Sequence, residues 1–304
     1  MLTNGGLNFI RFANDHLKYL NNMYMEKSFI AISFMVSMTI QSQELNVMTF
    51  NIRYSTMNDS LNAWPYRKDH AASQIKFHNV HIVGVQEALH EQVMDLTQSL
   101  TKYKYIGVGR DDGKTKGEYS AIFYDTTRLK LVESSTFWLS LTPEVPGSKG
   151  WDANITRIVT WAKFRNLSNK KIFFAFNTHF DHIGQEARRE SAKLLKQKVK
   201  DIAGNNPVII TGDFNAHPSD EPIKILVDEN DQNKFIDTKG ISITPHYGPQ
   251  GTFNGFGSKE RDNEPIDFIF IKGKWKVLQH ATLSQTWGGR FSSDHFPVFA
   301  KLSF

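Results

Sequence analysis

The sequence predicts an α/β fold in which mixed β-sheets pack together and helices lie on the outside. Three observations carry this prediction. The chain has 304 residues, 40% hydrophobic and 22% charged, which suffices for a large buried core. Short runs rich in Val, Ile, Phe and Thr recur along it. In the first two thirds these runs alternate with helical patterns, whereas the last third is mostly strands, which favours packed mixed sheets over a regular parallel barrel.

Eight runs have the composition and length of β-strands. In chain order they span residues 45–51, 82–86, 119–124, 157–164, 172–180, 207–211, 266–271 and 296–302. Helical spacing of apolar residues predicts three helices, over residues 66–77, 91–100 and 185–202. The last is the clearest, because Ala187, Leu195 and Val199 fall on one face while Lys and Arg residues fill the other.

The start of the chain has the organisation of an export signal. An uncharged, largely apolar run over residues 29–40 follows Lys27; it suits a signal peptide and is too short to span a bilayer. We therefore expect a signal peptide over residues 25–42, an over-extended start over residues 1–24, and an exported protein, periplasmic or secreted. The alternative is a buried amino-terminal helix or strand. Residues 43–304, without long linkers or repeats, are expected to form one domain.

Composition excludes several kinds of chemistry. The chain has no cysteine, which rules out disulfides, thiolate metal sites and a cysteine nucleophile. Its formal net charge of +5 is mild, so it favours anionic substrates without indicating a protein that coats nucleic acid.

Polar side chains recur where the predicted strands end or begin. Any one of them has the alternative interpretation of a turn or cap residue. Together they suggest one shared rim, formed by Asn51, Glu87, His179, Asp213, Asn215, Asp267, Asp294 and His295.

A rim of this composition favours a metal ion. Two carboxylates about 5 Å apart repel by roughly 3 kcal/mol at an effective dielectric of 20, so Glu87, Asp213 and Asp294 could share a pocket only with a cation or with raised pKa values. Carboxylate and amide ligands, in a chain without cysteine, favour Mg²⁺ or Mn²⁺ over a structural Zn²⁺. His179 and His295 suit proton transfer, because imidazole titrates near neutral pH.

The motifs around these residues resemble those of the endonuclease/exonuclease/phosphatase superfamily, in the same order over residues 45–303. They are Thr-Phe-Asn51-Ile-Arg, Val-Gln-Glu87, Gly-Glu118-Tyr-Ser, Asn-Thr-His179-Phe-Asp, Gly-Asp213-Phe-Asn215, Ile-Asp267-Phe-Ile and Ser-Asp294-His295. The resemblance implies a four-layer α/β sandwich, with two central mixed β-sheets flanked by helices. It also implies a metal-dependent hydrolase of phosphate esters.

The resemblance further implies roles for the carboxylates and amides. Glu87 matches the principal metal ligand, and Asn51 and Asp294 help to hold the metal and the phosphate. Asp213 and Asn215 match the pair that orients the attacking water and the phosphate. The implied mechanism is in-line attack of water on phosphorus without a phosphoenzyme.

The same resemblance assigns the two histidines. His295 matches the catalytic histidine held by Asp267, and His179 matches the second, with Glu118 as its expected carboxylate partner. Asp181 is a competing partner, since residues two apart on a strand point to one face. The sequence leaves open which histidine is the base and which is the acid.

Two arginines are candidates for binding the substrate. Arg110 lies in a Gly-rich loop, residues 107–118, that could clamp a phosphate; a solvated charged turn is the alternative. Arg157 heads a strand that points to the same rim, where it could contact phosphate or form a structural ion pair.

Three functions therefore compete. The first is an exported phosphodiesterase or phosphatase acting on the phosphate ester of a small molecule or a lipid head group. The second is a secreted non-specific endonuclease with nucleic acid as substrate, which should carry a basic track on both sides of the metal. The third is a non-catalytic protein that binds a phosphate ligand. In each case we expect a monomer without a stable membrane span.

Overall fold

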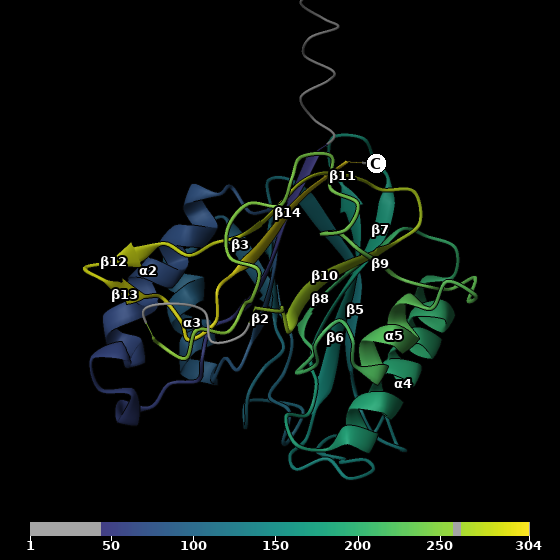
Figure 1. Ribbon diagram of the computed structural model, residues 1–304, viewed down its shortest axis with the longest axis horizontal. Coiled ribbons are helices and arrows are strands. Elements are labelled where there is room, and N and C mark those ends of the chain that lie inside the picture. Colours follow the sequence, from purple (N-terminus) through teal and green to yellow (C-terminus); the bar gives the residue numbers. More distant parts are fainter. Residues whose placement is uncertain (1–43, 258–262, 304) are drawn as a thin grey trace, which may run out of the picture. The chain divides into compact units, whose positions relative to one another are not determined.

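The computed structural model describes residues 44–257 and 263–303 (Figure 1). The predicted signal peptide and the segment before it lie outside the described residues. Residues 44–304 cluster as one compact unit. Within the described residues, no helix is both long enough and apolar enough to cross a membrane.

Two six-stranded mixed sheets form the centre of the fold. In spatial order, the first contains β11 (Lys276–Thr282), β14 (Val298–Ser303), β1 (Glu44–Asn51), β2 (Ile82–Gln86), β4 (Ile122–Asp125) and β3 (Tyr103–Ile106). The second contains β5 (Leu129–Trp138), β6 (Ile158–Asn166), β7 (Ile172–His179), β8 (Val208–Asp213), β10 (Asp267–Lys272) and β9 (Ile236–Asp237). A small hairpin joins β12 (Thr286–Trp287) and β13 (Arg290–Phe291).

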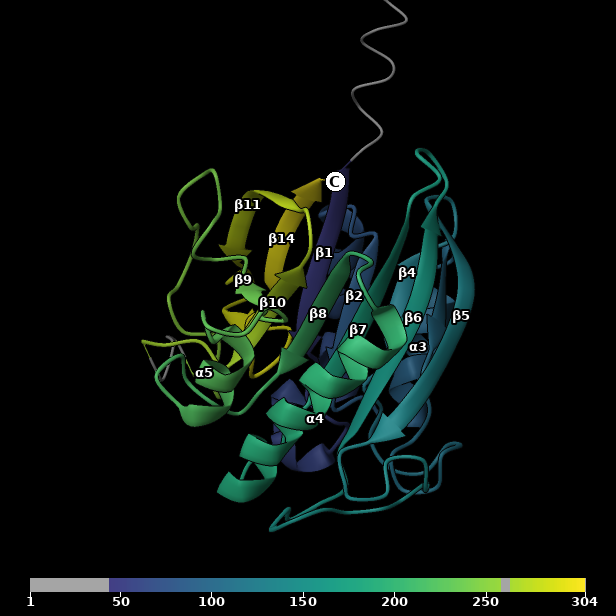
Figure 2. The same cartoon turned by 90° about the vertical axis from the view of Figure 1, so that its right-hand side faces the viewer.

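Helices cover the outer face of each sheet (Figures 1 and 2). The first sheet carries α2 (Trp64–Phe77) and α3 (His90–Ser99), preceded by the short 3₁₀ helix η1 (Met57–Asn62). The second sheet carries α4 (Gln185–Ala203) and α5 (Glu221–Val227), and Figure 2 shows α4 in front of β7 and β8. The four-layer α/β sandwich is therefore confirmed.

The strand sequences explain the layering, because alternate side chains enter different cores. On β1, Leu45 and Val47 belong to the core between the two sheets, whereas Met48 and Phe50 belong to the core under α2 and α3. Strands buried on both faces read as nearly continuous apolar runs, which is why the central strands could be predicted.

Each sheet contains one parallel pair at its centre, β1–β2 in the first and β7–β8 in the second. The other pairs within the two sheets are antiparallel. Helix α2 connects the first parallel pair and α4 the second. Because parallel strands end at the same edge of a sheet, Asn51 and Glu87 come together in one sheet, and His179 and Asp213 in the other.

A buried polar network joins the sheets below these strand ends. The Asn177 side chain on β7 donates to the carbonyl oxygens of Val85 and Ala121 (both 2.9 Å). Its Oδ1 accepts from Gln86 Nε2 on β2 (2.7 Å) and from Thr211 Oγ1 on β8 (3.0 Å). The network therefore fixes the two parallel pairs against each other next to the residues that follow them.

All eight predicted strands and three predicted helices are present, with small shifts of their ends. The predicted strand over residues 119–124 begins only at Ile122, because residues 119–121 lead into it as extended chain with one isolated bridge at Tyr119. The sequence analysis missed other elements. These are β3, β5, β9, β11, α5, the 3₁₀ helix and the hairpin.

Candidate active site

The polar strand ends meet in one cavity of about 570 Å³. Six of the predicted rim residues line it: Glu87, His179, Asp213, Asn215, Asp294 and His295. Asn51 and Asp267 lie directly behind, fully or almost fully buried, and each bonds to a residue of the lining. The predicted rim therefore exists, and both sheets contribute to it.

Two of the predicted rim residues adopt backbone conformations that are uncommon for side chains other than glycine. Glu87, one residue beyond β2, has φ +62°, and Asn215, two residues beyond β8, has φ +46°. The left-handed region is unfavourable for most residues, and such conformations gather at functional sites. At both positions the turn ends the strand and brings a polar side chain to the cavity.

The candidate metal ligands are held in place by hydrogen bonds. Asn51 Nδ2 donates to Glu87 Oε1 (3.0 Å) and to Asp213 Oδ2 (2.9 Å). The backbone N–H of Tyr54 donates to Glu87 Oε2 (3.2 Å). Arg53 Nε lies 3.8 Å from Asp294 Oδ2. These contacts fix the orientation of the carboxylates facing the cavity.

The carboxylates of Glu87, Asp213 and Asp294 lie close together in the cavity, and such crowding favours the binding of a cation. Burial raises the pKa of Asp213, and the charge of Asp267 adds to the effect. Burial likewise raises the pKa of Asp294, with a contribution from Glu87. A bound divalent ion would offset both effects, because it favours the ionised form of each carboxyl group.

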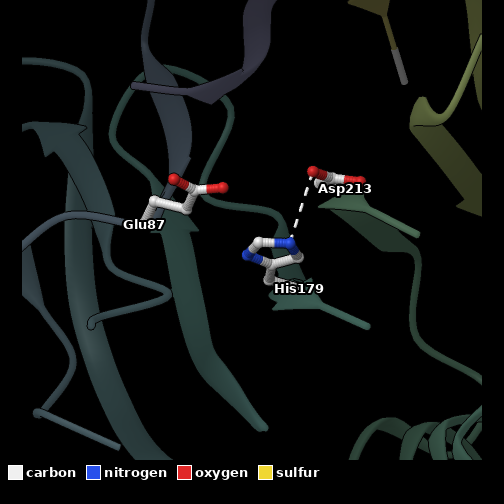
Figure 3. Close-up of side chains that lie close together, drawn as sticks. All are labelled: Glu87, His179 and Asp213. Carbon is white, nitrogen blue, oxygen red and sulfur yellow. Dashed lines mark ion pairs between the residues drawn. The ribbon is translucent and has the colours of Figure 1, made fainter. Parts of the chain in front are cut away.

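The donor atoms fit a divalent metal. Ligand atoms of Glu87, His179 and Asp213 lie within 4.8 Å of one another, and so do those of Asp213, Asp267 and His295. Figure 3 shows the first group, with His179 between the two carboxylates. Oxygen donors dominate, which suits Mg²⁺ or Mn²⁺. These donor atoms therefore suit a hard divalent ion. One member of the Glu87–His179–Asp213 group is an imidazole, which was predicted from the sequence to transfer protons rather than to bind metal.

His295 is oriented by Asp267, as predicted. Its Nδ1 lies 2.9 Å from Asp267 Oδ2, so Nδ1 carries the proton and Nε2 faces Asp213 Oδ2 at 3.8 Å. Burial alone would lower the pKa of His295, but the charge and hydrogen bond of Asp267, together with Asp213 and Asp294, raise it well above the ordinary value. The hydrogen bond to Asp267 therefore fixes the orientation of the ring.

His179 is in the opposite electrostatic environment. Its Nε2 accepts from Asn215 Nδ2 (2.9 Å), which also donates to the Phe180 carbonyl oxygen (3.0 Å), so the proton of the neutral ring lies on Nδ1. Asp213 Oδ2 lies 3.4 Å from Nε2 (Figure 3). Burial, followed by the charges of Arg157 and Arg110, lowers the pKa of His179 well below its ordinary value.

The predicted pairing of His179 with Glu118 is wrong. Glu118 lines the cavity but accepts from Arg110 Nη1 (2.5 Å). Asp181, the competing candidate, accepts from four backbone N–H groups in the segments around residues 154 and 183. Nδ1 of His179 is buried without a hydrogen-bond partner among the described residues. Glu118 and Asp181 therefore accept hydrogen bonds from donors other than His179, and the sequence pattern could not show which donors lie nearest.

The two predicted substrate-binding arginines have different positions. Arg157 lines the cavity and is 4% exposed. Arg110 is absent from the cavity lining and lies behind Glu118, so direct contact between Arg110 and phosphate is not supported by this geometry. In this conformation Arg110 holds Glu118 in place.

Arg53 and His182, which were not predicted as site residues, also line the cavity. Arg53 bonds to Asp59 (3.2 Å) and neighbours Asp294, and His182 Nδ1 accepts from Arg157 Nη2 (3.2 Å). Both stand inside or beside quoted motifs, Asn51-Ile-Arg53 and His179-Phe-Asp-His182. Their proximity to those motifs was the signal that could have identified them.

Fold and site together define a class of hydrolases built on two packed mixed sheets. The chain belongs to the endonuclease/exonuclease/phosphatase family, whose model matches residues 48–295. Members of this family are generally hydrolases of phosphate esters.

Solved structures and a curated relative agree with this assignment. The endonuclease/exonuclease/phosphatase from Bacteroides vulgatus is 42% identical with a TM-score of 0.82, and the match covers 86% of this chain and 99% of that one. A mannosyl-6-phosphatase from Bacteroides thetaiotaomicron is 39% identical with a TM-score of 0.81, covering 86% and 100%. Uncharacterized protein L388 of Acanthamoeba polyphaga mimivirus is 29% identical over 201 residues, 63% of this chain and 72% of its own.

Proposed function

We propose that the protein is a Mg²⁺-dependent hydrolase that cleaves a small phosphate ester by in-line attack of water on phosphorus. The observation that carries this proposal is the meeting of Glu87, Asp213 and Asp294 with two histidines in one cavity. Membership of a family of phosphoester hydrolases supports it. The similarity to a mannosyl-6-phosphatase supports a small, soluble substrate.

The metal would be held by Glu87, with Asn51 and Asp294 beside it. When bound, the ion would polarise a phosphoryl oxygen and offset the charge that develops there. Asp213 and Asn215 would orient water and phosphate; both line the cavity next to His179, which supports this role.

The histidines supply and remove protons. His295, fixed by Asp267, presents Nε2 to Asp213 and the cavity. His179 is neutral with its lone pair on Nε2, next to Asp213 and Asn215. One ring takes a proton from water and the other gives a proton to the departing alcohol, which balances the reaction.

The test is hydrolysis of p-nitrophenyl phosphate and bis-(p-nitrophenyl) phosphate with Mg²⁺, Mn²⁺ or EDTA. We expect metal-dependent turnover that falls by at least about 100-fold in Glu87→Gln and in His295→Ala. Asp95→Asn, which lies outside the cavity lining and bonds to Lys68 and Trp64, is the matched control for loss of a carboxylate. Turnover that survives EDTA, or that persists in both site variants, would refute the proposal.

A nucleic acid is the alternative substrate. The net charge of +5 is spread over the whole chain, which gives little support for a nuclease groove. An assay with plasmid DNA beside the small esters distinguishes a nuclease from a hydrolase of small esters, because a nuclease should cleave DNA at rates that fall steeply with salt.

A further inference from the structure

Arg157, a buried cation on the cavity wall, has N–H groups that make no hydrogen bond. Arg157 is 4% exposed, and its Nη1 and Nε have no hydrogen-bond partner among the described residues. Only Nη2 is engaged, by Nδ1 of His182 at 3.2 Å. Because guanidinium stays charged when buried, Arg157 is a positive charge with unused N–H groups at the edge of the active site.

Glu118, Asp181 and Asp213 act on the charge of Arg157, but none of these carboxylates hydrogen-bonds to its Nε or Nη1. Asp181 Oδ2 lies 3.7 Å from Arg157 Nε, within ion-pair range but without a hydrogen bond. The carboxylate of Asp181 is occupied by four backbone N–H groups. A buried charge without close partners is costly, which makes an anion from outside the protein the natural partner of Arg157.

Other arginines near the cavity are more fully engaged. Arg67 donates to the carbonyl oxygens of Ile52, Arg53, Asn62 and Ser292. Arg53 pairs with Asp59 and lies close to Glu87 and Asp294. Arg157 is therefore distinguished among these cavity-side arginines by its free Nη1, whereas the others have structural partners.

The cavity thus has an acidic side and a basic side. Glu87 and Asp294 form the first, where a divalent ion would bind, and Arg157 with His182 belongs to the second. A phosphate lying between the two sides would be close both to the carboxylates that would hold the ion and to the guanidinium of Arg157. A monoester suits this arrangement, because it carries three terminal oxygens and a charge of about −1.5 to −2 at neutral pH. A diester has two terminal oxygens and a single charge.

We propose that Arg157 binds a terminal phosphate oxygen that a diester lacks, and that the site therefore selects phosphomonoesters. The inference rests on the proposed hydrolase function. In the reaction, the oxygen of water bonds to phosphorus, the bond from phosphorus to the ester oxygen breaks, and the alcohol leaves with a proton. Arg157 holds its oxygen throughout and takes no part in proton transfer.

The experiment compares kcat/KM for p-nitrophenyl phosphate and bis-(p-nitrophenyl) phosphate in the full chain with Mg²⁺. The wild type should prefer the monoester. Arg157→Gln should lower the monoester value by about 10- to 100-fold, the usual worth of a hydrogen bond to a charged group, and the diester value by less than about 3-fold. The kcat/KM of Arg157→Lys for the monoester should lie between the values of the wild type and of Arg157→Gln. Arg165→Gln, on the exposed far end of β6, is the matched control and should change neither.

Equal losses for the two esters, or a wild type that prefers the diester, would overturn the monoester assignment. Failure of the wild type to hydrolyse either ester with any metal would instead overturn the proposed function. If Arg157→Gln does not fold, calorimetry on the wild type decides the question. Inorganic phosphate should then bind at least about 10-fold more tightly than dimethyl phosphate, and equal affinities would refute the role of Arg157.

Discussion

Asp267 shows how one buried side chain sets the orientation of another. It lies at the start of β10, in register with Asp213, and its Oδ2 is 2.9 Å from Nδ1 of His295. With the proton fixed on Nδ1, the lone pair or proton on Nε2 is directed to the cavity side. Asp267 is thus a positioning residue for His295.

Asp267→Asn should lower kcat by about 100-fold or more and leave KM nearly unchanged. The amide can donate to Nδ1 and so stabilise the wrong tautomer of His295, which removes its capacity for proton transfer. Steady-state kinetics with p-nitrophenyl phosphate measure the effect. Asp231→Asn, which removes the charge that pairs with Lys196 and keeps an oxygen for the backbone N–H of Asn233, is the control. A rise in KM with unchanged kcat would argue against orientation as the role of Asp267.

At the scale of residues, sequence reasoning found most of the site. Asn51, Glu87, Asp213 and His295 could be predicted because each lies at or near the end of an apolar run in the sequence, so its position required no knowledge of other strands. The partner of His179 could not be predicted, because Glu118 had to be weighed against donors that only folding brings near it. Arg53 and His182 were missed although each stands in or next to one of the quoted motifs.

Asn177 links secondary-structure elements, because it bonds to strands of both parallel pairs. Its amide satisfies two carbonyl oxygens beside β2 and β4, and its oxygen receives Gln86 and Thr211. Gly84 lies against this network, and a Cβ there would approach Thr211 Oγ1 to 2.1 Å. The two sheets therefore touch closely at this point.

Asn177→Ala should lower the free energy of unfolding by about 3 kcal/mol, because it leaves several buried polar groups without partners. Urea denaturation followed by circular dichroism measures the change. Asn205→Ala, at an exposed turn after α4, removes the same atoms and should alter stability by less than about 0.5 kcal/mol. Similar losses in both variants would mean that the network contributes nothing specific.

The missed elements share a physical cause. Most side chains of β5 are half-buried or exposed, and β11 mixes buried and exposed positions, so neither shows the continuous apolar run of a central strand. Helix α5 covers only seven residues, too few for a clear helical period. Such elements take their structure from tertiary contacts more than from their own pattern.

His280 on β11 and His246 in the loop between β9 and β10 form a part-buried pair that affects the stability of the whole molecule. His280 is 4% exposed, and its Nδ1 lies 2.9 Å from Nδ1 of His246. Because His246 Nε2 donates to the Pro249 carbonyl oxygen, its Nδ1 accepts the proton of His280. Burial, with the charges of His246 and Lys239, lowers the pKa of His280 to about 3.

Stability should therefore fall as the solution becomes acidic. Between pH of about 6.5 and 3 the unfolded chain binds a proton at His280 that the folded chain does not, so the free energy of unfolding decreases as pH falls through this window. From pH 7 to pH 5, His280 should account for a loss of about 1–2 kcal/mol. Urea denaturation at several pH values should show a smaller loss in His280→Gln than in the wild type. Equal pH dependence in the two proteins would contradict this assignment.

Export of the protein stays a prediction from residues 25–42. Amino-terminal sequencing of the mature protein would test it, with a start near Gln43 as the expected result.

The sequence by itself determined the central strands, the three long helices, the order of the motifs and most of the polar residues of the cavity. These features depend on periodicity and on residues adjacent in the chain, which a sequence displays directly. The tertiary structure alone decided the pairing of Glu118 with Arg110, the isolation of Nδ1 of His179 and the unused donors of Arg157. Each of these depends on which of several charged groups lies nearest after two sheets have packed together.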